Sequence, residues 1–262
     1  MDRQENLDFI LRYLLDERGE RTDALPASLH EKQRLMRALM NMWEPREIGA
    51  DFLTRQDAEL QLQAEEKGIV TPPRTGLQIW QGDITRLQVD AIVNAANAQG
   101  LGCWAPLHSC IDNCIHSAAG IQLRKECYDQ LQGRLIQTGE AIMTQGYNLP
   151  AKHVIHTVGP IISLTPNPSP KGEGSDYLPT KEQEKQLAQC YRSCLDLAEQ
   201  AGLESIAFCC ISTGVFHFPN KRAAEIAVET VKRYPRKSVK TVVFNVFLDK
   251  DLEIYRGLSV EC

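Results

Sequence analysis

Residues 90–97, with the sequence DAIVNAAN, place a short apolar run directly before two asparagines. The run formed by Ala91, Ile92 and Val93 is suited to a buried strand. Asn94 and Asn97 then follow as two amide side chains three positions apart. The stretch therefore predicts polar groups after a buried strand, where a ligand could approach.

Strand-like and helix-like segments alternate on both sides of this stretch. We expect strands at residues 77–80, 91–93, 140–144, 154–157, 205–211 and 241–247. We expect helices at residues 110–119, 182–201 and 221–234. Strands that alternate with helices are typical of α/β proteins and of mixed three-layer sandwiches.

The first 75 residues have a different, helical pattern. Two apolar stripes recur at helical spacing, at Leu7, Ile10, Leu11, Leu14 and Leu15 and again at Leu29, Leu35, Leu39 and Met42. A third helix is expected between Pro45 and Lys67, and Pro72 and Pro73 end the helical pattern because proline cannot continue a helix. We expect residues 1–75 to form a helical extension that covers and braces a second unit, residues 76–262.

Composition excludes several classes of protein. A net charge of −5 gives no basic footprint for duplex nucleic acid. The chain has no apolar run of the roughly 18 residues that a membrane span needs, and charged residues at the N-terminus do not form a secretory signal. We therefore expect a cytoplasmic protein that partners neither nucleic acid nor membrane. Residues 165–175, rich in Pro, Gly and Ser, are expected to form an exposed flexible loop.

The cysteines indicate a metal site. Nine cysteines, an odd number, argue against a disulfide framework in such a chain. Cys103, His108 and Cys110 form a C-x4-H-x-C run of residue types that bind zinc, and three protein ligands leave a fourth position for water or substrate. Two alternatives stay open: the three are unrelated loop residues, or Cys114, one helical turn after Cys110, is a ligand instead.

Two further segments place ligand-binding groups after strand-like runs. In residues 82–85 (GDIT), the Asp83 carboxylate can accept a hydrogen bond from an exocyclic amine or cap a helix. In residues 211–216 (ISTGVF), small side chains precede Gly214, which lets the backbone approach a phosphate closely. Neither segment is specific when taken alone.

Taken together, these segments resemble the macrodomain family, which binds ADP-ribose, both in their amino-acid sequences and in their order along the chain. The matching segments are GDIT (82–85), DAIVNAAN (90–97), IDN (111–113), IHSAAG (115–120), TGEA (138–141), GYNLPA (146–151), VIHTVGP (154–160) and ISTGVF (211–216). The resemblance covers about residues 77–247 and leaves the helical extension outside it.

The chain departs from the common macrodomain pattern after the two asparagines. Where the familiar hydrolases have a run of glycines, residues 100–112 read GLGCWAPLHSCID. In this respect the chain resembles the zinc-containing branch of microbial macrodomains, whose members also carry an N-terminal helical extension. That branch is associated with a sirtuin-like ADP-ribosyltransferase and a lipoyl-carrier modification system.

The resemblance implies a fold and a function. The implied fold is α/β, a three-layer α/β/α sandwich with a mixed sheet, preceded by the helical extension. The implied function is zinc-dependent hydrolysis that removes mono-ADP-ribose from a protein side chain, with an ester to an acidic residue as the expected linkage. A lipoyl-carrier protein is the candidate partner. Two other functions stay open: a reader that binds ADP-ribose without cleaving it, and an O-acetyl-ADP-ribose deacetylase.

The resemblance also implies roles for individual residues. Asp83 and the Ile84 backbone would hold adenine. The pyrophosphate would be wrapped by the loops that contain Gly102 and Ser212, Thr213, Gly214, Val215 and Phe216. Asn97 would reach the distal ribose, and Zn²⁺ on Cys103, His108 and Cys110 would lie near its anomeric carbon. Asp112 would position the water or a metal ligand, so Asn97 and Asp112 are the expected catalytic residues.

Overall fold

The computed structural model describes residues 2–20, 22, 24–73, 75–162 and 178–258. The segment expected to be a flexible loop, residues 165–175, lies outside the described residues. Within the described residues, no helix has the length and apolar character needed to cross a bilayer.

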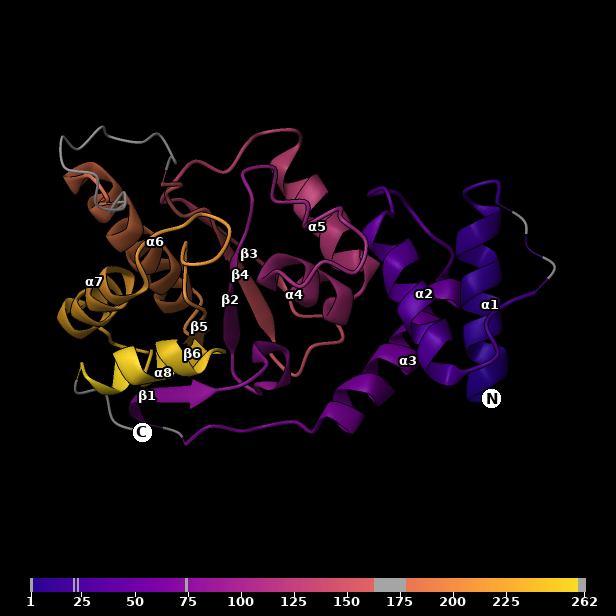
Figure 1. Cartoon of the computed structure of the whole chain (residues 1–262), viewed down its shortest axis with the longest axis horizontal. Helices are drawn as coiled ribbons and strands as arrows, with labels where there is room; N and C mark the ends of the chain where they lie inside the picture. Colours follow the sequence, from indigo (N-terminus) through magenta and orange to yellow (C-terminus); the bar gives the residue numbers. More distant parts are fainter. Residues whose placement is uncertain (1, 21, 23, 74, 163–177, 259–262) are drawn as a thin grey trace, which may run out of the picture.

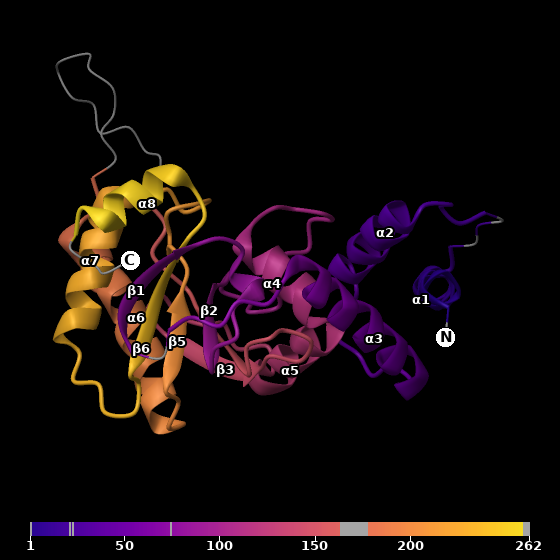
Figure 2. The same cartoon turned by 90° about the horizontal axis from the view of Figure 1, so that it is seen from below.

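A six-stranded mixed sheet forms the centre of the second unit (Figures 1 and 2). Its strands, in the spatial order β1-β6-β5-β2-β4-β3, are β1 (Gly76–Gln81), β6 (Thr241–Val246), β5 (Ser205–Phe208), β2 (Ala91–Ala95), β4 (His153–Thr157) and β3 (Ala141–Gln145). The paired strands run parallel except β3, which is antiparallel to β4. Every residue of β6 is buried, and so is every residue of β2 except Ala95, as expected of a parallel sheet covered on both faces.

Helices cover both faces of the sheet. The helices α4 (Ile111–Ala119) and α5 (Ile121–Leu131) lie on one side, and α6 (Lys181–Gln200) and α7 (Asn220–Arg233) lie on the other, with α8 (Asp249–Arg256) beside α7 (Figures 1 and 2). This arrangement confirms the predicted three-layer α/β/α sandwich. Because the central strands are parallel, the segments that follow β1, β2 and β5 meet at one edge, where ligands bind in open α/β sheets.

The N-terminal helices form a separate layer beyond α4 and α5 (Figure 1). They are α1 (Arg3–Asp16), α2 (Leu29–Asn41) and α3 (Ala50–Lys67). Their apolar faces make a core of their own, and Ile121 at the start of α5 joins it. The helical pattern of the first 75 residues is thus confirmed, whereas the domain boundary at residue 75 stays a prediction.

Two helices escaped the sequence analysis, and one strand is shorter than expected. Helix α5 follows α4 with only Gly120 between them, and its buried positions include Arg124 and Cys127, which hide the apolar spacing. Helix α8 near the C-terminus was not predicted either. The strand expected over 205–211 ends at Phe208, because the chain turns from Cys209 into the loop that follows.

Candidate functional site

Residues 100–110, here called the cysteine loop, connect β2 to the start of α4 and bring the three expected metal ligands together. One ligand atom from each of Cys103, His108 and Cys110 lies within 4.8 Å of the others. The distance from Cys103 Sγ to His108 Nδ1 is 3.6 Å. Cys110 is also the N-cap of α4, because its Sγ accepts a hydrogen bond from the Asn113 backbone N–H.

The donor set fits a divalent zinc ion. Tetrahedral zinc places its ligand atoms roughly 3.5–4 Å apart, close to the spacing found here. Burial, with the nearby Cys103 thiol and Asp112 carboxylate, raises the pKa of Cys110 to about 12. The thiol therefore keeps its proton until a cation displaces it, which is how metal binding and proton release are coupled. His108 is exposed and the two cysteines are half-buried, so the cluster is open to solvent. Cys114 is not part of it.

Asp112 and Asn97, the two expected catalytic residues, lie against each other beside this cluster. The Asn97 side-chain amide donates to Asp112 Oδ2 over 3.3 Å and to the Gly102 carbonyl over 3.0 Å. The Asp112 carboxylate also accepts a 2.7 Å hydrogen bond from the Asn94 side chain, a role that the sequence analysis missed; Asn94 lies within β2 and not after it as expected. Burial raises the pKa of Asp112 to about 6.

Two buried histidines lie next to Asp112 and its partner Asn94. His156 Nδ1 lies 3.1 Å from the Asn94 amide, and burial lowers the pKa of His156 to about 3, so the ring is neutral. His116 is also fully buried with its pKa lowered by burial, and its Nε2 lies 3.6 Å from Asp112 Oδ1. A Cβ at Gly102 would lie 2.7 Å from the His116 ring, so the cysteine loop can pass here only with glycine. His116 thus packs against the cysteine loop at Gly102.

Residues 211–217, here called the serine loop, contain the expected phosphate-binding segment. Ser212 has a φ of 66°, a left-handed conformation that is uncommon for a residue other than glycine. Its hydroxyl is buried and has no hydrogen-bond partner among the described residues. A Cβ added at Gly214 would have no other atom within 4 Å, and Val215 is 66% exposed. The loop thus offers an unpaired hydroxyl and accessible backbone beside Gly159, at the ligand-binding edge of the sheet.

Asp83 has the N-cap role that its sequence position also allowed. Its Oδ1 accepts hydrogen bonds from the backbone N–H and the hydroxyl of Thr85, at the start of the 3-10 turn η1 (Ile84–Arg86). Its other carboxylate oxygen lies 3.5 Å from Lys67 Nζ on α3. Asp83 lines a cavity of about 350 Å³ together with Leu107, Cys114 and residues of α2 and α3. The proposed contact of Asp83 with adenine stays a prediction.

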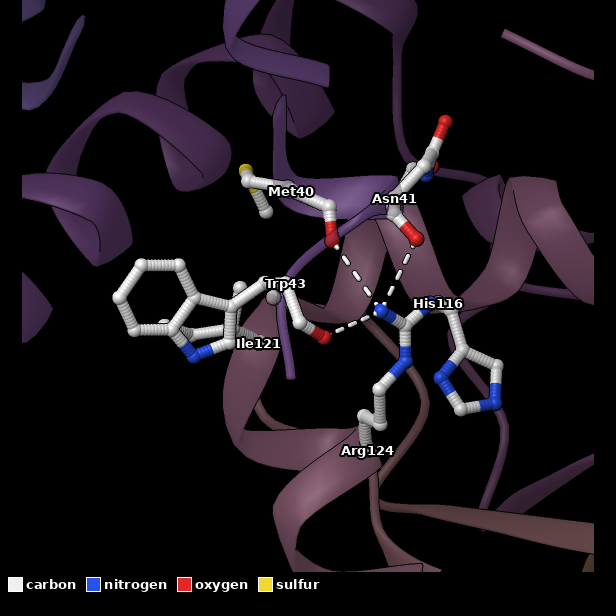
Figure 3. Close-up of a pocket in the computed structure, with 8 residues that line it drawn as sticks. Met40, Asn41, Trp43, His116, Ile121 and Arg124 are labelled. Atoms are coloured by element: carbon white, nitrogen blue, oxygen red, sulfur yellow. Dashed lines mark hydrogen bonds between the residues drawn. The ribbon is translucent and has the colours of Figure 1, made fainter. Parts of the chain in front are cut away.

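Sequence reasoning missed the residues that join the helical layer to the cysteine loop. Arg124 Nη1 donates to three backbone carbonyls at and just after the end of α2, those of Met40, Asn41 and Trp43 (Figure 3). Arg37 and Asn41 of α2 also contact the loop. A lone arginine or asparagine on a helix has no distinguishing pattern in the sequence, so no signal could have found these residues.

Known proteins are similar to this chain over most of its length. The model of the family described as Macro domain matches residues 93–227. A protein named protein-ADP-ribose hydrolase from Treponema medium is 46% identical over 98% of this chain and 99% of its own length. A protein of the same name from Staphylococcus aureus strain MRSA252 is 45% identical over 94% of this chain and 93% of its own.

A solved structure is similar to this chain over part of its length. A mutant macrodomain of Oceanobacillus iheyensis with ADPR aligns with a TM-score of 0.59 and 37% identity. The alignment covers 70% of this chain and 91% of that one.

Proposed function

The chain belongs to the Macro domain family and is a hydrolase, and on this premise we propose that it is a zinc-dependent protein ADP-ribosylhydrolase. Its substrate would be a protein that carries mono-ADP-ribose on a side chain. The observation that carries the proposal is the position of Cys103, His108 and Cys110, which converge within 4.8 Å beside the paired Asn97 and Asp112.

Cys103, His108 and Cys110 would hold the zinc ion. When bound, zinc supplies Lewis acidity that polarises an oxygen of the substrate and favours a deprotonated oxygen nearby. Two thiolates reduce that acidity, so we favour polarisation and positioning over a strongly activated hydroxide.

The remaining loops would bind ADP-ribose. We assign adenine to Asp83 and Ile84, because the Asp83 carboxylate can accept from an exocyclic amine and lies beside a cavity. We assign the pyrophosphate to the Gly102 backbone and to Ser212, Thr213, Gly214, Val215 and Phe216. The unpaired Ser212 hydroxyl supports this, since a buried hydroxyl without a partner is stabilised by an acceptor from a ligand. Oriented amides bind phosphate without a net positive charge, so the acidic composition is no obstacle.

Asn97 and Asp112 would act at the distal ribose. The Asn94 and Asn97 amides fix the Asp112 carboxylate from two sides, which suits a group that must orient a water molecule. With a pKa of about 6, Asp112 is mostly ionised at neutral pH and close to the value at which a carboxylate can accept and return a proton.

The substrate side of the proposal is more specific. We propose an ester between ADP-ribose and an acidic side chain as the bond that is cleaved, and a lipoyl-carrier protein of a sirtuin-type ADP-ribosylation system as the partner. We propose a cytoplasmic location, with residues 1–75 as a helical extension to a macrodomain of residues 76–262.

Incubation of the purified protein with an acidic-ester ADP-ribosylated protein tests the proposal. We expect release of ADP-ribose, loss of that release after zinc is removed with a chelator, and recovery when zinc is added back. Cys103→Ala, His108→Ala and Cys110→Ala should each lower zinc content and release, while ADP-ribose binding measured by calorimetry persists. Binding without release in the zinc-loaded protein would identify a reader. Release of acetate from O-acetyl-ADP-ribose alone would identify a deacetylase.

A further inference from the structure

Helix α2 contacts the far end of the cysteine loop directly, and it is joined to the near end of the loop through Arg124 of α5. At the far end, Arg37 Nη2 lies 2.8 Å from the His108 carbonyl oxygen and 2.8 Å from Asn113 Oδ1. The Leu107 backbone N–H donates to Asn41 Oδ1 over 3.0 Å. Leu107 has a φ of 59°, so this hydrogen bond holds an uncommon backbone conformation next to the metal-ligand candidate His108.

At the near end of the loop, Arg124 links the loop to the C-terminal end of α2. Its Nε donates to the Leu101 carbonyl over 2.6 Å, and its guanidinium lies 4.0 Å from the centre of the Trp104 ring. The same guanidinium donates to the carbonyls of Asn41 at 3.0 Å and Trp43 at 2.6 Å (Figure 3). A buried cation there is favoured by the unpaired carbonyls and the negative end of the helix dipole.

These contacts also fix α2 relative to α4, the helix that carries Asp112. Asn41 Nδ2 donates to Ser117 Oγ over 2.9 Å, and the Asn113 amide donates to the Ala105 carbonyl in the cysteine loop over 2.9 Å. The loop backbone and the first turns of α4 therefore share one hydrogen-bonded frame with α2. A displacement of α2 would move His108 relative to Asp112.

We propose that α2 is part of the catalytic architecture, and that Arg37, Asn41 and Arg124 are positioning residues which hold the cysteine loop in its working geometry. None of the three needs to touch substrate. The effect of such residues is on the placement of reacting groups, where a displacement of about 1 Å can lower the rate roughly 100-fold. The turnover part of this inference rests on the proposed function, but the part that concerns loop order does not.

Hydrogen–deuterium exchange of the full chain tests the loop directly. We expect Arg37→Ala to speed exchange across residues 101–110 by about tenfold or more, because the backbone loses its fixed partner. Asn41→Ala should do the same, whereas Asn41→Asp keeps the acceptor for the Leu107 N–H and should retain most of the protection. Arg12→Ala, at an exposed arginine of α1, is the matched control and should leave exchange in the loop unchanged.

Turnover and zinc retention give independent readouts. For Arg37→Ala we expect kcat to fall about 10- to 100-fold with KM nearly unchanged, faster loss of zinc to a chelator, and partial rescue by Arg37→Lys. If loop exchange, zinc loss and kcat all match wild type in Arg37→Ala and Asn41→Ala, the inference is wrong. If wild type fails to hydrolyse the substrate, the proposed function fails, and the exchange data alone still decide whether α2 holds the loop. The Asn41→Asp and Asn41→Ala pair decides the question if Arg37→Ala does not fold.

Discussion

The cysteine loop and the serine loop lie at the same edge of the sheet but are held in different ways. The serine loop is held mainly by backbone hydrogen bonds, from the Phe218 N–H to the Ser212 carbonyl, from the His217 N–H to the Gly214 carbonyl and from the Ile162 N–H to the Phe216 carbonyl. The cysteine loop depends on side chains from elsewhere, including Arg37 and Arg124. A loop held by backbone hydrogen bonds can keep one function, such as phosphate binding, when side chains elsewhere change. A loop supported from another layer can carry different chemistry on the same sheet.

Asp112→Asn should have the largest effect on turnover. It tests the cysteine loop, and the serine loop should not be affected. The substitution keeps the shape of the side chain but removes the charge, and it places an amide group against the donors of Asn94 or Asn97. We expect kcat to fall about 100- to 1,000-fold, in the range of a lost proton-transfer group. ADP-ribose affinity measured by calorimetry should change less than tenfold. A large loss of affinity with normal kcat would place Asp112 in binding instead.

Gly159→Ala should act on the serine-loop side. A Cβ at residue 159 would lie 1.9 Å from the Ser212 hydroxyl and 2.9 Å from Ile211 Cγ2, so the serine loop would have to move. Overpacking of this kind costs about 1–3 kcal/mol. If that cost falls on the bound form, ADP-ribose binds about 10- to 100-fold more weakly. The measurement is calorimetric titration with ADP-ribose.

The control for Gly159→Ala lies outside both loops. Gly49→Ala, at the N-cap of α3, adds the same methyl group where nothing lies within 4 Å and where φ is −63°, so ADP-ribose affinity should stay within about threefold of wild type. Zinc content should be unchanged in both variants, because neither residue contacts the cysteine loop. Loss of zinc in Gly159→Ala would show that the two loops are coupled.

The two loops also differ in how much of them the sequence could predict. The strands and the C-x4-H-x-C run follow from local patterns of apolar and polar residues, whereas the roles expected of Asn97 and Asp112 came from the resemblance to the macrodomain family. The supports of the cysteine loop do not, because the contact between Arg37 and His108 joins positions 71 residues apart through a surface that exists only after α2 packs on α4. Arg124 lies on α5, a helix that the sequence analysis did not predict, and it is only 4% exposed.

A substitution of Glu199, which lies at the opposite edge of the sheet, should have the smallest effect. It should not change the conformation of either loop. Its carboxylate accepts hydrogen bonds from the backbone N–H groups of Lys237, Ser238 and Val239, before β6 begins. Partial desolvation raises the pKa of Glu199, but these hydrogen bonds outweigh it, so that the pKa is lowered to about 2. A lowered pKa in the folded state adds stability above the ordinary pKa of about 4.5, and this stability is lost as the pH falls from there toward 2.

We expect Glu199→Gln to lower the free energy of unfolding at pH 6 by about 1 kcal/mol, since solvent screens this surface carboxylate. The difference from wild type should shrink at pH 3, because at that pH the unfolded wild-type chain is stabilised by a proton on Glu199 that the folded chain does not take up. Thermal unfolding at the two pH values measures this, with Glu65→Gln, an exposed position on α3, as the control. Because Glu199 lies far from the ligand-binding edge, zinc content and ADP-ribose affinity at pH 7 should equal those of wild type. A changed affinity would mean that the conformation of the serine loop also depends on the packing of α6 against the sheet.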